Sequence, residues 1–358
     1  MIEDVPQSKI DNNINFRNII INGDMSIAQR GTSVTGKTAD GYYTTDRWNH
    51  SINLGTWSID QTTDVPSSQG FAKSHKMTCT TGGSTSSGTQ TYLHTRLEGQ
   101  NLQYLKKGTA NAESLTLSFW GKSATTTGTM TVELFDTDNS RQISKQISLT
   151  TSWTKYTINY DADTTGTLNN DNGASLYVIF WVSAGSNFTS GTLSETWTSN
   201  TNANRAVGQT NFAVTNTELY FTGVQLEAGT TASDFEFLPY DVNLQRCQRY
   251  YFLKADHSTG SENIGVGLYY SSSDFRTVVN FPVSMRTRAS LDVETASNAY
   301  QFRRNGGFDN LDDFFADGNI SLTSMTLINQ SDASGTAGQA GYLFTNSSGA
   351  FLAFDAEL

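Results

Sequence analysis

The chain has 358 residues, a formal net charge of −11 and only 16% charged residues, and it is rich in Gly, Ser, Thr and Asn. This length suits two domains with buried cores, and the composition is typical of many short strands joined by polar turns. The negative charge argues against nucleic acid and anionic membranes as partners, because both need a concentrated positive surface. With no run of about 18 apolar residues, we expect no membrane insertion.

The first 17 residues are polar and rich in asparagine. They lack the basic start and apolar centre of a signal peptide, so we expect assembly in a cytosol. Without sustained periodicity, residues 1–17 predict an extended N-terminal arm. Such an arm either docks on a neighbouring protein or has no structure of its own.

Residues 18–237 predict a jelly-roll-type β-sandwich. Strands are expected at Ile19–Ile21 and Met25–Ala28, on either side of a turn whose Gly23 can take a positive φ. Leu176–Val182 is apolar at every position and predicts a central strand covered on both faces. The other clear strand signals alternate with a period of two and comprise residues 115–120, 130–134 and 156–160.

A buried strand and a short helix are expected next. Leu219 to Leu226 is too short and too rich in β-formers for a helix. Asp241 follows a proline and is a typical N-cap residue, so residues 238–252 predict a linker helix. Leu244, Cys247 and Tyr251 would then share its apolar face.

Residues 253–358 predict a smaller C-terminal β-sandwich domain, and the fold class of the chain is therefore all-β. Phe275, Val279, Phe281 and Val283 lie on one face of an expected strand, and Pro282 within it places that strand at a sheet edge or at a strand end. Further short strands are expected at residues 291–293, 320–322, 325–327, 342–344 and 351–354.

Four ordered blocks of sequence resemble a family of tailed-bacteriophage virion proteins, mostly tail-fibre or appendage proteins. The first block, NIIINGDMSIAQRG, is followed shortly by TDRW, and the last, AFDAEL, closes the chain. Between them stand TGVQLEAG with FEFLPY, and then CQRYY. These blocks span residues 18–31, 45–48, 222–229, 235–240, 247–251 and 353–358.

The resemblance implies a virion component with no catalytic residues to carry over. It implies a homotrimer that attaches to other virion proteins through the arm and contacts a glycan on the host surface. Tail fibre and capsid-attached fibre or decoration protein both remain open. A polysaccharide-degrading enzyme or an accessory carbohydrate-binding protein is the alternative from another functional class.

Catalytic and redox motifs are missing from the sequence. The four histidines have no metal-ligand spacing, and no nucleophile elbow, P-loop or dinucleotide fingerprint occurs. We therefore predict no enzyme, although remote pairs of carboxylates for glycosidic cleavage stay open. Cys79 and Cys247 are expected to be buried as small apolar residues.

No cofactor is expected, with one candidate exception, a structural calcium ion. The NGD block is also similar to the first strand of carbohydrate-binding jelly rolls, which often hold calcium between the first and last strands. Asp24 and Glu227 are the candidate ligands, with Asp136 and Asp138 as a second pair. Calcium needs six to eight oxygen ligands, so solvated turn carboxylates remain the simpler interpretation.

Glycan recognition needs exposed aromatic rings beside amides and carboxylates. Trp57, Trp153 and Trp197 are the candidate glycan-binding residues. Trp197 stands among polar, loop-like neighbours. An anchor that fixes the long loop to the sandwich is the competing interpretation of this tryptophan.

Overall fold

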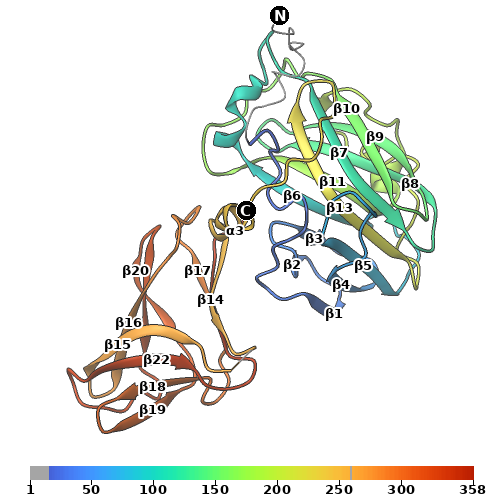
Figure 1. Ribbon diagram of the computed structural model, residues 1–358. Helices are drawn as coiled ribbons and strands as arrows, with labels where there is room; N and C mark the ends of the chain where they lie inside the picture. The colour runs from blue at the N-terminus through green and yellow to red at the C-terminus, as the bar shows by residue number, and fades with distance from the viewer. Residues whose placement is uncertain (1–15, 259) are drawn as a thin grey trace, which may run out of the picture. The chain divides into compact units, whose positions relative to one another are not determined.

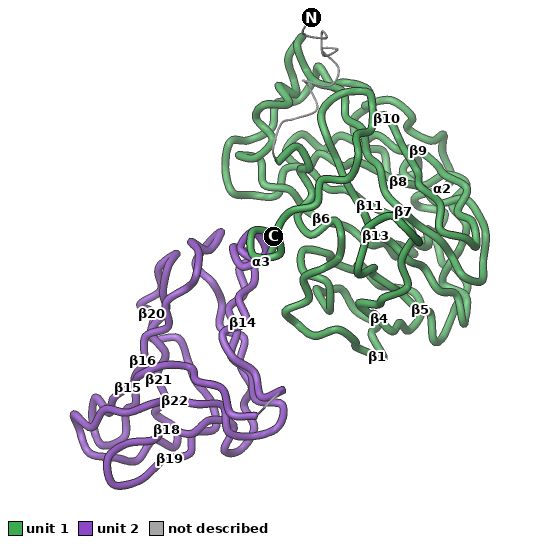
Figure 2. The backbone as a smooth tube through the Cα atoms, viewed as in Figure 1, with its two compact units in different colours: residues 1–243 green, residues 244–358 purple. Residues whose placement is uncertain are grey.

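The computed structural model describes residues 16–258 and 260–358, which form two compact units (Figure 2). Unit 1 extends to Asn243, and unit 2 begins at Leu244. Both consist mainly of antiparallel strands, as Figure 1 shows. Of the predicted arm, residues 1–17, only Phe16 and Arg17 lie within the described residues. None of the helices in these ranges is long and apolar enough to cross a membrane.

Two sheets of unit 1 face each other and enclose one core. The ring of Phe180 lies 5.0 Å from that of Phe119 and 5.2 Å from that of Phe221, both in the opposite sheet. The predicted β-sandwich is confirmed. The six-stranded sheet has the order β1 (Ser33–Lys37), β4 (Thr56–Thr62), β5 (Ser74–Thr81), β13 (Glu218–Ala228), β7 (Leu115–Ser123), β10 (Thr154–Tyr160).

The second sheet of unit 1 has seven strands, and β11 lies near its middle. Most of β11 is buried on both faces, as its continuous apolar sequence predicts, but Tyr177 is only partly buried. One face packs in the sandwich core, and a long loop covers part of the other face. The strand order is β12 (Thr198–Ser199), β9 (Arg141–Leu149), β8 (Gly128–Asp136), β11 (Ala174–Ala184), β6 (Gln90–Glu98), β3 (Asn49–Ser51), β2 (Gly41–Tyr42).

The predicted strands at Ile19–Ile21 and Met25–Ala28 are wrong. The segment forms an irregular buried turn instead, in which Asn22 and Met25 both have positive φ. The side-chain amide of Asn22 donates 2.9 Å hydrogen bonds to two backbone carbonyls, those of Ile27 and Asp46. These side-chain bonds hold the segment where a strand ladder was expected.

Gly23 lies where no side chain fits. A Cβ atom there would be 2.0 Å from the carbonyl oxygen of Val224, whose amide donates a 2.9 Å hydrogen bond to Gly23 O. We expect Gly23→Ala to lower the free energy of unfolding by about 1–3 kcal/mol, because the two backbones must separate. Urea denaturation measures the change. Gly88→Ala is the control, since nothing lies within 4 Å of its added Cβ, and equal midpoints for both variants would contradict the prediction.

The helix α3 (Tyr240–Gln248) is shorter than the predicted range 238–252. Asp241 lies in its first turn. Tyr251 is not on the helix: it begins the next strand, where it pairs with Asp355. The prediction that Tyr251 lies on the apolar face of the helix is therefore wrong, because the helix ends before this residue. Cys79 and Cys247 are both buried.

Unit 2 contains a three-stranded and a seven-stranded sheet around one core. The rings of Phe281 and Phe354, 4.8 Å apart, belong to this core. The strand Asp274–Asn280 ends before Pro282, which agrees with the predicted strand end, but Phe281 and Val283 are not part of it. The first sheet has the order β14 (Tyr251–Asp256), β23 (Phe351–Asp355), β17 (Ser290–Val293), and the second β19 (Gly307–Leu311), β18 (Tyr300–Arg304), β22 (Ala340–Thr345), β15 (Asn263–Ser271), β16 (Asp274–Asn280), β21 (Ser324–Asn329), β20 (Phe315–Ile320).

Candidate functional site

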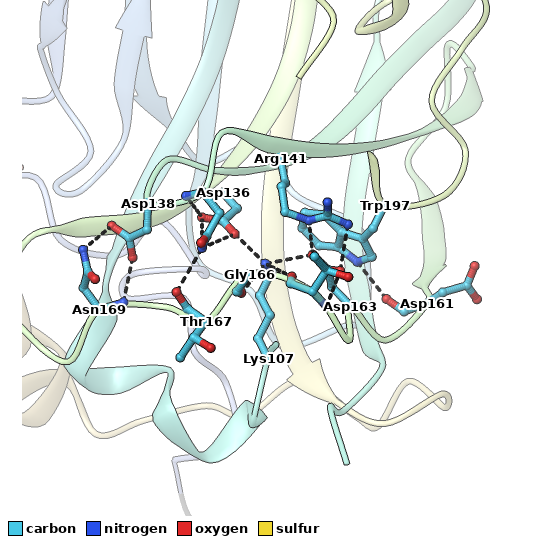
Figure 3. A network of polar contacts seen from close by, with 12 residues as sticks. Lys107, Asp136, Asp138, Arg141, Asp161, Asp163, Gly166, Thr167, Asn169 and Trp197 are labelled. Carbon is cyan, nitrogen blue, oxygen red and sulfur yellow. Dashed lines mark hydrogen bonds and ion pairs between the residues drawn. The ribbon is translucent and has the colours of Figure 1, made fainter. Parts of the chain in front are cut away.

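Trp197 anchors its loop. Its indole nitrogen donates a 2.8 Å hydrogen bond to the carbonyl of Asp161, and the ring packs against the core of unit 1. The ammonium of Lys107 lies 5.0 Å from the ring centroid, and both residues are labelled in Figure 3. A cation at this distance is attracted to the face of the ring. The surroundings of Trp197 therefore fit the anchor interpretation better than a platform for sugar.

The other two predicted tryptophans are also engaged within the chain. Trp57 is fully buried in the core, so its assignment as an exposed glycan platform is corrected. The strand β4 points it inward, where its indole nitrogen bonds the carbonyl of Leu54 at 2.9 Å. Trp153 is partly buried and donates a 2.9 Å hydrogen bond to Asp64, with the ammonium of Lys122 lying 5.2 Å from its ring centroid.

Lys107 is the centre of a buried ionic network (Figure 3). Its ammonium contacts Asp136 at 2.5 Å and Asp163 at 2.8 Å. It also donates to the carbonyls of Thr165 and Gly166. These contacts hold the segment that contains Asp163 against the strand β8. The network thus fixes a loop by electrostatics, and the ammonium has no capacity left for a ligand.

Arg141 completes this network. Its guanidinium binds both oxygens of Asp163, at 2.8 and 2.9 Å. Burial alone would raise the pKa of Asp163, but the hydrogen bonds from Arg141 and Lys107 outweigh burial and lower it. Asp163 is therefore a structural anion. The second pair of calcium candidates serves the same loop: Asp136 binds Lys107, and Asp138 accepts hydrogen bonds from Asn169 (Figure 3).

A pocket of about 420 Å³ lies beside the network. The two 3-10 helices η1 (Gly99–Asn101) and η2 (Gln103–Leu105) pass through this part of unit 1. The pocket has no aromatic lining on which a sugar could stack. It is lined by Leu102, Gln103, Lys106, Lys107, Thr109, Asn111, Thr167 and Leu168.

Asp24 and Glu227, the first pair of calcium candidates, each bind donors of the chain. Asp24 accepts hydrogen bonds from Ser26 and from Asn243, and burial raises its pKa. Glu227 accepts from the amide and the hydroxyl of Ser233. Within residues 16–258 and 260–358, no three His, Cys, Asp or Glu side chains are grouped to hold a metal ion. Structural calcium at these two carboxylates stays a prediction.

The seven-stranded sheet of unit 1 presents a group of aromatic and polar side chains on the side away from the core. Tyr177 of β11 is paired with Arg96 of β6 on one side and with Phe135 of β8 on the other. Alternate residues of these strands, such as Leu93, point into the core. We call this group the outer face, and it consists of Tyr92, His94, Arg96, Phe135 and Tyr177.

His94 organises the outer face. Its ring stacks on Tyr177, with centroids 5.5 Å apart and an interplanar angle of 6°. Arg96 donates a 3.1 Å hydrogen bond to its Nε2 and lies 5.0 Å above the Tyr177 ring. Burial, and then the charge of Arg96, lower the pKa of His94 well below its ordinary value. The neutral ring must carry its hydrogen on Nδ1, which has no acceptor within the described residues.

The long segment after β11 covers only part of this side of the sheet. It contains α2 (Ser186–Thr189), the strand β12 and the 3-10 helix η3 (Asn202–Asn204). From this segment Arg205 binds both oxygens of the buried Glu133, at 2.8 and 3.1 Å. Phe188 packs there with the buried Trp181. At the margin of this cluster, three aromatic side chains stay partly exposed: Tyr92, Phe135 and Tyr177.

Our sequence predictions missed the outer face. The signal was present in β6, where Tyr92, His94 and Arg96 alternate with residues of the core. This period of two predicts a strand with one polar and aromatic face. Sequence does not show, however, which strands lie beside β6, and the face exists only because β8 and β11 do.

Several solved protein structures are similar to this chain, all at low sequence identity. No protein-family model and no curated protein matches this chain. A carbohydrate-binding module described as CBM4 is 12% identical, with 58% of this chain and 97% of that chain covered and a TM-score of 0.31. The family 11 carbohydrate-binding module from Clostridium thermocellum is 13% identical, with 56% and 98% covered and a TM-score of 0.28.

A phage protein is also among the similar structures. The enzymatically active domain of tailspike protein 4 from bacteriophage CBA120 is 11% identical, with 59% of this chain covered and a TM-score of 0.31. This chain covers only 21% of that chain. At TM-scores this low we infer nothing about function from these likenesses, and the fold assignment rests on the strand pairing described above.

Proposed function

We propose that this chain is a structural protein of a tailed-bacteriophage virion, a tail fibre or appendage, that binds glycan on the host surface and breaks no bond. The virion assignment is supported by the sequence blocks at both ends of unit 1 and at the close of the chain. Glycan binding rests on one observation, the outer face of unit 1. There, partly exposed aromatic rings stand beside an arginine and a neutral histidine.

This combination of groups suits a sugar. The C–H groups of a pyranose ring pack on aromatic side chains, while hydroxyls need fixed donors and acceptors nearby. Tyr92 and Tyr177 supply rings and phenol groups from neighbouring strands, and Arg96 supplies a guanidinium already oriented by His94. Because the strands already hold these side chains in place, binding a sugar costs little conformational entropy.

The test compares the unchanged chain with the Tyr177→Ala variant. Binding is first measured on an array of bacterial surface oligosaccharides, and the affinity for any oligosaccharide that binds is then measured by titration. We expect roughly tenfold weaker binding, the effect of losing one stacked ring. Tyr104→Ala is the matched control, because this tyrosine is 49% exposed and lies in η2, not on the sheet. We expect its binding and its thermal stability to equal those of the unchanged chain.

Two results would count against the proposal. If Tyr177→Ala and Tyr104→Ala bound the oligosaccharide with equal affinity, the outer face would not be the glycan site. Release of reducing sugar from host envelope by the purified chain would contradict the non-catalytic role and favour the enzyme alternative.

The proposal also covers the place of the chain in the particle. It comprises assembly in the host cytoplasm, three copies per appendage, and attachment to other virion proteins through residues 1–17. A reconstruction of the intact particle tests it directly, because attachment point and copy number separate a tail fibre from a capsid-attached fibre. A particle without this chain would refute the virion assignment.

A further inference from the structure

The seven-stranded sheet of unit 2 has an exposed apolar side. Thirteen large hydrophobic side chains of the described residues are exposed, and seven of them lie on this sheet. Contiguous apolar surface on this scale is unusual for a monomeric protein and marks an interaction site. The seven are Val266, Leu268, Tyr270, Val278, Phe308, Phe315 and Tyr342.

Strand pairing shows that these residues share one side. Across β19, β18, β22 and β15 the paired residues are Phe308, Arg303, Tyr342 and Val266. Because paired residues of adjacent strands point to the same side of a sheet, this row is continuous. A second row across β15, β16, β21 and β20 consists of Leu268, Arg276, Ile328 and Phe315. Figure 2 labels these strands in unit 2, which is purple.

The opposite side of the same sheet is already used. Tyr269, Phe275 and Phe302 alternate with the exposed residues and pack in the core of unit 2. The exposed side is therefore not a second core of this unit. We name it the apolar sheet face, defined by the two rows above together with Tyr270 and Val278.

The two arginines on the apolar sheet face have different partners. Arg276 pairs with Asp274 at 2.9 Å and with Asp317 at 3.1 Å. Arg303 donates to Gln301 and lies 5.0 Å above the ring of Phe344. Arg276 is neutralised by carboxylates and Arg303 is a single charge, so the face lacks the concentrated positive surface that binds a polyanion such as nucleic acid or an acidic polysaccharide. Val266, Leu268 and Val278 make the two middle strands of the face, β15 and β16, largely aliphatic.

We propose that the apolar sheet face is the surface through which copies of this chain associate. Every other copy presents the same apolar surface, so neighbouring copies, including the three of the proposed appendage, can cover one another's exposed side chains. Seven strands spaced by ~4.8 Å and ~17 Å long give about 600 Å² per copy, or about 1,200 Å² in total. This total exceeds the roughly 1,000 Å² that a specific interface needs.

Sedimentation equilibrium of the full chain tests the proposal, with Val278→Lys and Val214→Lys as a matched pair. The two valines are similarly exposed, at 56% and 47%, but Val214 belongs to unit 1. We expect the unchanged chain and Val214→Lys to assemble. Val278→Lys is expected to raise the dissociation constant by about 100-fold or more, because it places a charge in an apolar interface.

Tyr342→Ser, which adds no charge, is the second variant, and we expect it to weaken assembly about tenfold. Hydroxyl-radical labelling should show Tyr270 and Tyr342 protected in the assembled chain and reactive in Val278→Lys. Binding of an oligosaccharide to unit 1 should be unchanged in all these variants, which separates this inference from the proposed function.

Three outcomes would overturn the inference. The unchanged chain could be monomeric at every concentration, or both lysine variants could assemble equally well. A monomeric chain that floats with phosphatidylcholine vesicles would assign the apolar sheet face to lipid instead of to a second copy.

Discussion

Lys107→Met is expected to lower the free energy of unfolding of unit 1 by about 3–5 kcal/mol, the usual cost of removing one partner from a buried ion pair. Asp136 is fully buried and Lys107 is 9% exposed, so water cannot replace the lost ammonium. Asp163 keeps Arg141, whereas Asp136 is left with the amide of Asn139. Urea denaturation followed by tryptophan fluorescence measures the change.

The adjacent lysine provides the control. Lys106 pairs with Glu113 at 2.9 Å, but both side chains are largely in water. Ion pairs exposed to water contribute little to the free energy of unfolding, so we expect Lys106→Met to change it by less than about 1 kcal/mol. If the two methionine variants unfolded at the same urea concentration, the buried network would not be what holds the loop around Asp163.

Acidification from about pH 6.5 to about pH 4 is expected to cost unit 1 on the order of 3 kcal/mol through one histidine pair in its core. His50 and His75 come from opposite sheets, and both are fully buried. Burial lowers the pKa of His50 from 6.5 to about 4. Burial, and then the neighbouring His50, lower the pKa of His75 well below its ordinary value.

Hydrogen bonds fix the tautomers of the two neutral rings. Nε2 of His50 and Nε2 of His75 are 3.0 Å apart, so one must donate and the other accept. Nδ1 of His50 faces the carbonyl of Gly41 at 3.3 Å and must carry a hydrogen, which leaves its Nε2 as the acceptor. His75 then donates through Nε2 and accepts from the hydroxyl of Thr45 through Nδ1 at 2.7 Å.

The direction of the pH effect follows from the difference between the pKa of His50 in the folded and in the unfolded chain. Because the folded pKa of His50 is the lower one, the unfolded chain binds more protons between about pH 4 and 6.5. The stability contributed by neutral His50 is complete above this range, is lost as the pH falls through it, and changes no further below it. His94, also neutral and buried, acts in the same direction.

Denaturant midpoints across this pH range test the prediction. We expect His50→Gln to flatten the dependence on pH, whatever it does to stability at neutral pH. His257→Gln is the control, since His257 lies in the other unit and is not fully buried. An unchanged slope in His50→Gln would show that other groups dominate the acid sensitivity.

The sequence alone determined the fold class and the order of its parts. Alternation of apolar and polar residues is a local property, so β7, β8 and β10 could be located from it. Continuous apolar character marked β11 as a central strand, and a proline and an N-cap type residue marked the short helix α3. The helix was predicted too long because one further apolar residue, Tyr251, happened to fit the helical period.

The tertiary structure alone decided which side chains meet. Lys107 contacts Asp136, 29 residues away, and the ring of Trp197, and no local pattern indicates either contact. The same reason explains Trp57, whose burial depends on the sheet that packs against β4. A strand pattern reports that two faces differ, while neighbouring strands determine whether a face is covered or exposed. The outer face of unit 1 and the apolar sheet face of unit 2 could therefore be recognised only from the structure.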